Sequence, residues 1–411
     1  MEERRVVVTG LGTVSPVGNT VTEAWENLVN GVCGIGEITR FDTAGYKAKL
    51  DAEVKNFNAR DWMDKSEMLR SDLYAQYAIA ASQQAIDDSG IAGSVDVQRF
   101  AVYYGSGIGG INTFTCEMRK LDSRGPSRVS PFFVPMMIPN MAAGMIAIRF
   151  GCKGPALPAV TACASGTNAI GEAYRLIRHG YADAVITGGA EAAISEPGVA
   201  GFQNMQALSV STDPAAASLP FDRRRAGFVI GEGAATLILE EYERAKKRGA
   251  HIYGEVTGYG STCDAYHITA PAPDAEGGAR AIRQALEESG WKEDERIYIN
   301  AHGTGTPLND KGETLAIKSA LGHDAAYKAM ISSSKSMTGH MLGAAGAFEA
   351  MVSLLTLEKG IVTPTINLIE KDSDCDLDYV PLTARDARMD IAISTSLGFG
   401  GHNAVIAFRK V

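Results

Sequence analysis

Residues 159–168 read Ala159-Val160-Thr161-Ala162-Cys163-Ala164-Ser165-Gly166-Thr167-Asn168, a junction between a predicted strand and a predicted helix. A thiol at this point is aimed at the unpaired N–H groups and partial positive charge of a helix start, which favour a thiolate and can hold an oxyanion. The residues around Cys163 are small, so a substrate carbonyl can approach the backbone closely. The alternative is a buried structural thiol, which is the common state of a free cysteine.

Two histidines lie on turns of the same kind later in the chain. The first follows the apolar strand pattern 297–299 in Asn300-Ala301-His302-Gly303-Thr304-Gly305-Thr306-Pro307. The second follows Met330-Ile331 in Ser334-Lys335-Ser336-Met337-Thr338-Gly339-His340 and precedes a Gly- and Ala-rich helix predicted over 342–351. Open α/β sheets build their sites at the carboxyl ends of strands, so we expect both turns to converge with the Cys163 turn. Their matching contexts favour a catalytic site over hydrogen-bonded surface histidines.

Cysteine and histidine are also zinc ligands, but their spacing argues against a metal site. The sequence has no C-x-x-C pair, no H-x-x-x-H pair and no H-E-x-x-H helix, which are the usual zinc-binding patterns. The cysteines are scattered, at positions 33, 116, 152, 163, 263 and 375, which suits a reducing cytosol. Residues Met1–Arg5, of which all but Met1 are charged, lead into a strand pattern without an apolar signal segment, so we expect a cytoplasmic protein.

A short internal repeat indicates how the chain is organised. Residues 85–90 (Ala-Ile-Asp-Asp-Ser-Gly) recur as residues 285–290 (Ala-Leu-Glu-Glu-Ser-Gly), and an Arg-led strand pattern with a Gly-rich turn follows each copy. We therefore expect two homologous α/β halves that meet near Gly249. Residues 1–250 would carry the nucleophile and residues 251–411 the two histidines. Composition alone predicts only an α/β fold with mostly buried sheets.

Composition excludes several classes of protein. Hydrophobic residues make up 45% and charged residues 21% of the chain, which is typical of a soluble globular protein. A net charge of −9 and a pI near 5.4 argue against nucleic acid as a partner. The uncharged stretch 129–148 resembles a membrane span, but Pro131, Pro135 and Pro139 interrupt it. A buried core or interface segment is therefore expected there, and no membrane association.

These motifs closely resemble those of the β-ketoacyl-acyl-carrier-protein synthases, the condensing enzymes of fatty acid and polyketide synthesis, and most of all the synthase II type. The resemblance runs end to end and rests on Val6–Gly12, Thr161–Cys163, His302–Thr306, Lys335–His340 and Leu397–Asn403. It implies a thiolase-like α/β fold of two duplicated halves in a layered α-β-α-β-α arrangement. The Cys-His-His set differs from the Cys-His-Asn set of the initiating synthases, which points to a decarboxylating elongation enzyme.

The resemblance also implies a role for each catalytic residue. Cys163 would carry an acyl chain, with the oxyanion held by the N–H groups of Cys163 and Phe399. His302 and His340 would donate to the malonyl thioester carbonyl while CO2 leaves, and the carbanion would attack the acyl-Cys to give 3-oxoacyl-acyl-carrier-protein. Lys335, paired with Glu349, would tune the field around His340.

Further site residues follow from the same resemblance. Phe399, between two glycines, would gate the acyl pocket, which Ile108 and Phe202 would line, and Thr304 and Thr306 would contact pantetheine. A structural monovalent cation would be bound by Asn300, Glu349, Ser394 and Asn403, and no other cofactor is required. His402 stands where the family usually has Thr, and its role is unassigned.

The expected partners are acyl carrier protein, in its acyl and malonyl forms, and a second copy of the chain. An acidic carrier needs a local basic patch on a chain of this net charge. The candidates are Lys65 and Arg70 with Arg124 and Arg128, or the cluster Arg223–Arg225. The stretch 129–148 fits a homodimer interface. Two alternatives stay open: a polyketide-type ketosynthase, and a non-catalytic chain-length partner subunit, a class that lacks the nucleophilic Cys.

Overall fold

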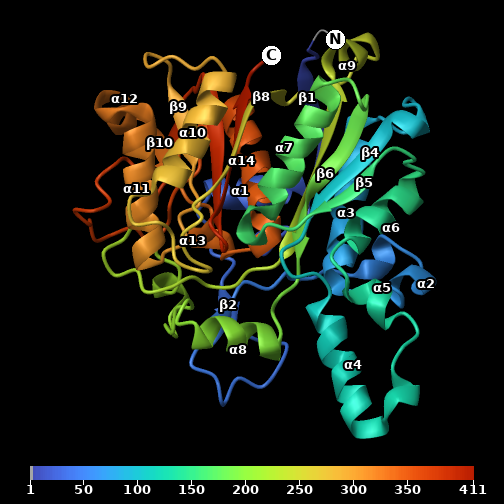
Figure 1. Ribbon diagram of the computed structural model, residues 1–411. Coiled ribbons are helices and arrows are strands. Elements are labelled where there is room, and N and C mark those ends of the chain that lie inside the picture. The colour runs from blue at the N-terminus through green and yellow to red at the C-terminus, as the bar shows by residue number, and fades with distance from the viewer. Residues whose placement is uncertain (1–2) are drawn as a thin grey trace.

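The structure, a computed structural model, describes residues 3–411, which build one ten-stranded mixed sheet covered by helices (Figure 1). The strand order is β10-β9-β13-β14-β8-β1-β7-β6-β4-β5. The first five strands along the chain are β1 (Val6–Val14), β4 (Phe100–Gly105), β5 (Ala156–Ala159), β6 (Ala184–Glu191) and β7 (Gly233–Glu241). The other five are β8 (Gly254–Cys263), β9 (Ile297–Asn300), β10 (Met330–Ser332), β13 (Ile391–Gly398) and β14 (His402–Arg409).

The sheet is a duplicated unit. In the first half, β4 pairs in parallel with β5 and β6, and β7 then pairs antiparallel with β6 and β1. The second half repeats this pattern, because β9 pairs in parallel with β10 and β13, and β14 pairs antiparallel with β13 and β8. The halves join where β1 pairs with β8, from Val6 against Val256 to Val8 against Gly254. The domain boundary at residue 250 stays a prediction.

Helices form the remaining layers of the fold. The longer ones are α1 (Val21–Val29), α3 (Leu73–Ser89), α4 (Ile111–Arg124), α6 (Met141–Phe150), α7 (Ser165–Arg178), α8 (Glu196–Asn204), α10 (Glu276–Glu288), α11 (Pro307–Leu321) and α14 (Ala345–Lys359). The shorter ones are α2 (Lys65–Met68), α5 (Phe133–Met137), α9 (Tyr242–Lys247), α12 (His323–Lys328) and α13 (Lys335–Thr338). Short two-stranded ladders join β2 (Gly36–Glu37) to β3 (Leu50–Asp51) and β11 (Ile361–Val362) to β12 (Arg385–Asp386).

The two halves of the continuous sheet lie on either side of two central helices, so the layers follow the order α-β-α-β-α that the family resemblance implies. Helices α7 and α14 contact each other and strands of both halves, so they form the central layer. Helices α3 and α6 cover the outer face of the first half, and α10 and α11 cover the second, as Figure 1 shows on its right and left sides. This arrangement confirms the thiolase-like fold, and it brings the ends of β9, β10 and β13 toward the turn before α7.

Glycines let the outer helices pack directly on the sheet in both halves. A Cβ on Gly10 of β1 would lie 2.3 Å from the carbonyl oxygen of Ala85 in α3, and one on Gly258 of β8 would lie 2.0 Å from that of Ala285 in α10. Any side chain at either position would therefore displace a helix. The helix residue of each contact, Ala85 or Ala285, begins one of the repeated segments 85–90 and 285–290. The sequence repeat therefore corresponds to a structural repeat.

The two central helices begin with the same strained turn. A 3-10 turn precedes α7 at Ala162–Ala164 and another precedes α14 at Leu342–Ala344. Ala162 has φ of 50° and Leu342 has φ of 49°, left-handed values that cost a non-glycine residue on the order of 1–3 kcal/mol. Such strain is concentrated at functional sites. Cys163 follows Ala162 directly.

The uncharged stretch 129–148 forms α5 and most of α6, which are separated around Pro139. Several apolar side chains on this side are exposed, including Val134, Ile148 and Leu157, and Ile148 has an exposed fraction of 79%. This stretch therefore lies partly at the surface, whereas Ala142, Ala143 and Ile146 of α6 are buried in the core. No helix in the described part of the chain is both long and apolar enough to cross a membrane.

Candidate active site

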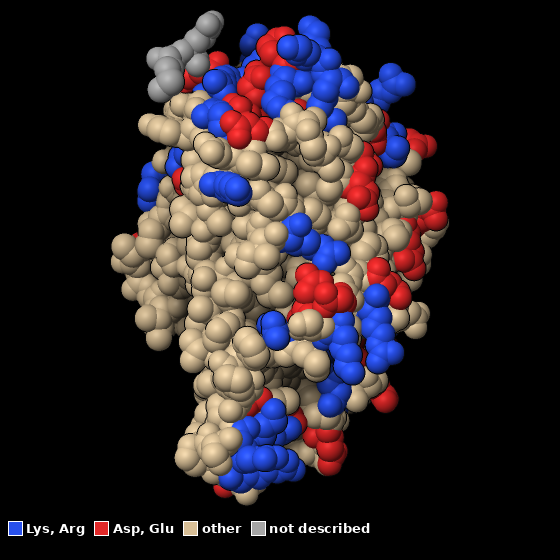
Figure 2. All heavy atoms as spheres, turned by 90° about the vertical axis from the view of Figure 1, so that its right-hand side faces the viewer, with Lys and Arg blue, Asp and Glu red and all other residues tan. Residues whose placement is uncertain are grey.

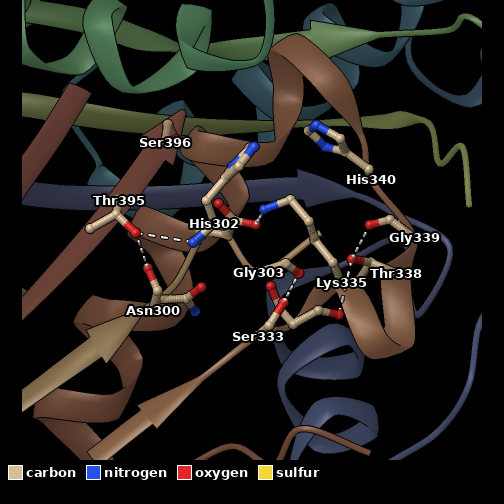
Figure 3. Close-up of polar contacts among 12 residues, drawn as sticks. Asn300, His302, Gly303, Ser333, Lys335, Thr338, Gly339, His340, Thr395 and Ser396 are labelled. Carbon is tan, nitrogen blue, oxygen red and sulfur yellow. Dashed lines mark hydrogen bonds and ion pairs between the residues drawn. The ribbon is translucent and has the colours of Figure 1, made fainter. Parts of the chain in front are cut away.

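Three turns meet at one point of the molecule. Cys163 comes from the turn before α7, His302 from the turn after β9, and His340 from the segment after α13. The Cys163 sulfur and the nearest ligating nitrogens of both histidines all lie within 4.8 Å of one another. The two imidazole rings are 5.1 Å apart and nearly perpendicular, and Figure 3 shows them rising from separate loops above Lys335. All three side chains are buried.

A cavity of about 640 Å³ opens onto this cluster. Its lining is mainly apolar and includes Phe202 and Phe399, and it also includes Cys163 and both histidines. Thr304 and Thr306 line the same cavity, with their hydroxyl oxygens 2.9 Å apart. The cavity thus offers an apolar channel with a few polar groups leading to a thiol, which is the usual character of a small-molecule site.

The tautomer of His340 follows from its surroundings. The backbone N–H of Leu342 donates to Nδ1 of His340 over 3.2 Å, so a neutral ring carries its proton on Nε2. Burial lowers the pKa of His340 well below its usual value, and the positive charge of Lys335 lowers it further. His340 is therefore a neutral hydrogen-bond donor at physiological pH.

His302 shares the same electrostatic environment. Burial is the main cause that lowers its pKa well below the usual value, followed by the charge of Lys335 and the electrostatic effect of the neighbouring His340. Its backbone N–H donates to Glu313 over 2.7 Å and to the hydroxyl of Thr395 over 3.0 Å, and Figure 3 draws the contact with Thr395. Glu313 also accepts from the N–H of Gly303 and the Thr395 hydroxyl. Sequence reasoning missed Glu313, since a carboxylate that binds backbone amides leaves no motif.

Lys335 and Glu349 form a buried ion pair beside the histidines. Their side chains are 1% and 2% exposed. Burial raises the pKa of Glu349 to about 7, against the opposing effect of Lys335. Because Lys335 lowers the pKa of both histidines and that of Cys163, it acts on all three residues through its charge.

The protonation of Cys163 differs from the sequence-based expectation. Burial raises its pKa to about 12, although Lys335 and the backbone N–H groups of Phe399 and Cys163 itself act in the opposite direction. The helix-start N–H groups favour the thiolate, as the sequence indicated, but desolvation outweighs them. The same contacts place two N–H groups beside the sulfur, where an oxyanion hole for a bound thioester would lie.

Phe399 lies between Gly398 and Gly400 in the turn that joins β13 to β14, beside the cavity. Gly400 has φ of 83° and its N–H donates to the carbonyl of Ile268 over 2.8 Å. The Phe399 ring lies 6.3 Å from that of Phe202. Phe202 and Ile108 pack against the apolar cluster that contains Cys163, whereas the lining of the cavity includes only Phe202 of these two. His402 packs its ring against Gly400.

Three of the four cation-ligand candidates share an unusual feature. Within residues 3–411, Asn300 Oδ1, Ser394 Oγ and Glu349 Oε2 are buried without a hydrogen-bond partner, and Asn300 faces Ser394 across the β9–β13 ladder. Such oxygens suit a hard cation. The side chain of Asn403 instead lines the cavity and donates to Asp264 over 2.7 Å. The fit therefore rests on Asn300, Ser394 and Glu349.

The two candidate basic patches differ in their ion pairs. Arg223 pairs with Glu370, Arg224 with Asp222, and Arg225 with Asp372. Within residues 3–411, no ion pair involves Lys65, Arg70, Arg124 or Arg128, and Arg70 lies over the ring of Phe132 at 4.8 Å. Figure 2 shows a group of Lys and Arg side chains, with some acidic ones among them, at the lower end of the molecule. These four residues, called the α2–α4 patch below, remain available to an acidic partner.

Comparison with known proteins agrees with this geometry. Two family models match, the beta-ketoacyl synthase N-terminal domain over residues 3–245 and the beta-ketoacyl synthase C-terminal domain over residues 253–369. The chain belongs to the β-ketoacyl synthase family. Among curated β-ketoacyl synthases, it is 52% identical over 412 residues to the 3-oxoacyl-[acyl-carrier-protein] synthase 2 of Synechocystis sp., covering 100% of this chain and 99% of the relative. It is 50% identical over 410 residues to that of Staphylococcus aureus, with the same coverage.

Solved ketosynthase structures show the same fold. A beta-ketoacyl synthase from Burkholderia phymatum superposes with a TM-score of 0.92 at 36% identity, covering 99% of this chain and 100% of that one. A type II polyketide ketosynthase, solved with its acyl-carrier protein and bound to the hexaketide, superposes with a TM-score of 0.92 at 36% identity over 100% of both chains.

Proposed function

We propose that this chain elongates fatty acyl chains by decarboxylative Claisen condensation. It joins an acyl group held on Cys163 to malonyl-acyl-carrier-protein, and it releases 3-oxoacyl-acyl-carrier-protein and CO2. The observation that carries the proposal is the meeting of one thiol and two neutral, buried imidazoles at the base of an apolar cavity.

Acyl transfer is the first half-reaction. The Cys163 sulfur attacks the thioester carbonyl of the acyl carrier, and the N–H groups of Cys163 and Phe399 stabilise the oxyanion. The C–S bond to the carrier then breaks. The carrier leaves as a thiol with the proton that Cys163 gave up, and a nearby imidazole can relay that proton. Covalent capture divides the reaction into two steps and predicts ping-pong kinetics.

Decarboxylation and condensation form the second half-reaction. The malonyl thioester carbonyl accepts hydrogen bonds from the Nε2–H groups of His302 and His340, so the enolate left by CO2 develops its charge against two fixed donors. Its carbon attacks the acyl-Cys carbonyl, the new C–C bond forms, and Cys163 leaves as the thiolate. Lys335 contributes by holding both imidazoles in their neutral, donating form.

Fatty acid elongation is favoured over the polyketide alternative by the degree of similarity. The chain is 50–52% identical to curated synthases named for 3-oxoacyl-[acyl-carrier-protein] and 36% identical to the polyketide ketosynthase. A non-catalytic chain-length subunit is disfavoured because Cys163 and both histidines are present and adjacent.

Acyl carrier protein is the proposed partner, docked on the α2–α4 patch. The arginines of the 223–225 cluster are engaged by carboxylates of the same chain, which leaves less positive charge there for a carrier. The patch residues have no such partners within residues 3–411.

A homodimer is proposed through the face formed by α5, α6 and the edge strand β5. Figure 2 shows this side of the molecule as largely uncharged, with Ile148 and Leu157 exposed. A second copy would cover apolar side chains that a monomer leaves in water. We also propose a cytoplasmic location, consistent with six cysteines that are all free, and a structural monovalent cation at Asn300, Ser394 and Glu349.

An assay of the purified protein tests the proposed function. Acyl-carrier and malonyl-carrier thioesters are supplied together, and the products are sized by mass spectrometry. We expect a 3-oxoacyl product two carbons longer than the donor, with one CO2 released per turn. Decarboxylation without any elongated product from any donor length would contradict the proposal.

A further inference from the structure

Glu191 is a buried acid to which the mechanism above gives no role. It ends β6 and has an exposed fraction of 0%. Its Oε1 accepts from the Ser106 hydroxyl over 3.0 Å and from the N–H groups of Ile108 and Gly109 over 3.1 and 3.3 Å. Its Oε2 accepts from the N–H groups of Gly107 and Gly343 over 2.8 and 3.1 Å.

This donor set suits an anion. Four of the five partners are backbone N–H groups, which can donate but cannot accept a proton from a carboxylic acid. Burial raises the pKa of Glu191, and these hydrogen bonds act against that rise. A carboxylate with several N–H donors is stabilised in its charged form. The site is therefore a small anion hole filled by a side chain of the same chain.

The carboxylate binds two turns, and a third turn packs against one of them. A Cβ on Gly107 would lie 3.0 Å from Glu191 Oε2 and 3.2 Å from the carbonyl oxygen of Ala162, and a Cβ on Gly343 would lie 2.4 Å from the N of Gly107. The turn after β4, the turn that carries Cys163 and the turn before α14 are thus packed against one another around Glu191. None of them could move without disturbing the others.

Each of these turns affects a different part of the proposed reaction. Ile108 lies in the first turn, in the apolar cluster with Cys163. Gly343 follows Leu342, whose N–H fixes the tautomer of His340. The negative charge of Glu191 also acts on Cys163 and opposes formation of the thiolate. One carboxylate therefore binds the turn that holds Ile108 and the turn that orients His340, and the first of these turns packs against the turn that carries the nucleophile.

We propose that Glu191 is a positioning residue that keeps the acyl-pocket turn, Cys163 and His340 in a single arrangement, so that both half-reactions depend on it. The inference rests on the proposed function. The proposed role of Glu191 differs from that of the histidines, which act in decarboxylation, and from that of Ile108, which would contact the acyl chain.

The test compares Glu191→Gln with a matched control, Glu240→Gln. Glu240 is equally buried, but it lies at the other end of the β6–β7 ladder from Glu191 and pairs with Arg244 and Arg248. Alkylation of Cys163 by iodoacetamide at pH 8 is followed by peptide mapping, which separates Cys163 from the exposed Cys116 and Cys263. Thermal unfolding, elongation and malonyl decarboxylation are measured on the same samples.

We expect Glu191→Gln to alkylate faster at Cys163. Loss of a neighbouring negative charge favours the thiolate, and a pKa decrease of about one unit gives about a tenfold faster reaction. Elongation and decarboxylation should both fall by about 10-fold to 100-fold, the scale of a small misplacement of catalytic groups. Glu240→Gln should leave the alkylation rate within about twofold. A folded Glu191→Gln protein with wild-type alkylation and elongation would overturn the proposal.

A second variant covers the case in which Glu191→Gln does not fold. Ser106→Ala removes one hydrogen-bond donor to Glu191 Oε1 and keeps the negative charge of Glu191. Elongation should therefore fall by at least about threefold, while the alkylation rate of Cys163 stays unchanged. Unchanged elongation would overturn the proposal. Alkylation requires no substrate. Absence of elongation in the wild-type protein would therefore count against the proposed function, and the alkylation comparison would still test the charge of Glu191.

Discussion

Cys163 is subject to opposing influences, and their balance determines how it reacts. Two backbone N–H groups and Lys335 favour the thiolate, but burial has the larger effect and raises the pKa to about 12. The nucleophile is therefore a thiol at rest and becomes a thiolate only as it attacks. This differs from cysteine enzymes in which a paired histidine stabilises a resting thiolate.

The titration of Cys163 gives the first prediction. Because the thiol pKa is raised, the thiolate fraction at pH 7–10 lies far below one and increases tenfold with each pH unit. Alkylation of Cys163 by iodoacetamide should therefore rise about tenfold per unit across this range, without a plateau. A plateau below pH 9 would show that a resting thiolate exists.

Substitution of Cys163 separates the two half-reactions. Cys163→Ala should abolish acyl transfer and condensation, since no other thiol lies beside His302 and His340 in the described part of the chain. Cys163→Gln should retain decarboxylation of malonyl thioester, because the two imidazole donors remain. Intact-mass detection of acyl-enzyme and measurement of CO2 release check both results. Elongation by the Ala variant at near wild-type rate would refute the assignment.

The paired histidines predict the complementary behaviour. His302→Ala and His340→Ala each remove one donor to the enolate oxygen, so decarboxylation should fall by at least about 100-fold. Acylation of Cys163 should persist at a measurable rate, since the N–H groups beside the sulfur are unchanged. Single-turnover acylation and CO2 release are measured separately. Loss of acylation with intact decarboxylation would reverse the roles.

At the scale of elements, the turn after β4 is the place to test chain-length selection. Ile108 is half-buried in the cluster with Cys163 and Phe202, and its N–H is fixed by Glu191. Ile108→Phe adds volume to a packed region at a cost on the order of 1–3 kcal/mol. Activity on long donors should then fall by about 10-fold to 100-fold, while the shortest donors are little affected. A kcat/KM series over donor length is the measurement. An equal fall at every length would indicate a role in folding.

The turns that hold the catalytic residues were predictable from sequence, whereas the buried carboxylates that hold these turns in place were not. Glycine-rich turns after apolar strands predicted the locations of Cys163, His302 and His340, because strand ends in an α/β sheet share an edge. Glu191 and Glu313 were missed, since they bind backbone amides of turns distant in sequence and carry no local pattern. The motif indicated that the helix start favours the thiolate of Cys163, but it could not show the larger effect of desolvation, which depends on packing.

At the scale of the whole molecule, duplication gives the two halves of the fold different tasks. Equivalent turns precede α7 and α14, with φ of 50° at Ala162 and 49° at Leu342. The residue that follows is Cys163 in the first turn and Gly343 in the second. The first turn thus supplies the nucleophile. The second supplies the amides that orient His340 and bind Glu191. A single active site therefore requires both halves.

The surface charges predict where the carrier docks. The chain has a net charge of −9, so an acidic carrier must be drawn by a local patch whose effect is screened by salt. The double variant Arg124→Ala/Arg128→Ala removes two cations that have no ion-pair partner in residues 3–411. KM for acyl-carrier donors should rise about 3-fold to 10-fold and become less salt-dependent, because exposed charges contribute about 0.2–1 kcal/mol each.

The kcat of the double variant should stay unchanged, as should its activity on a small acyl thioester without a carrier, since the patch lies outside the catalytic cluster. Arg223→Ala is the matched control, because its guanidinium already pairs with Glu370 on the same surface and its loss should leave KM within about twofold. Kinetics with acyl-carrier donors and with a small acyl thioester, each at two salt concentrations, decide between the α2–α4 patch and the 223–225 cluster. A higher KM for Arg223→Ala, with wild-type behaviour of the double variant, would place the carrier on the 223–225 cluster.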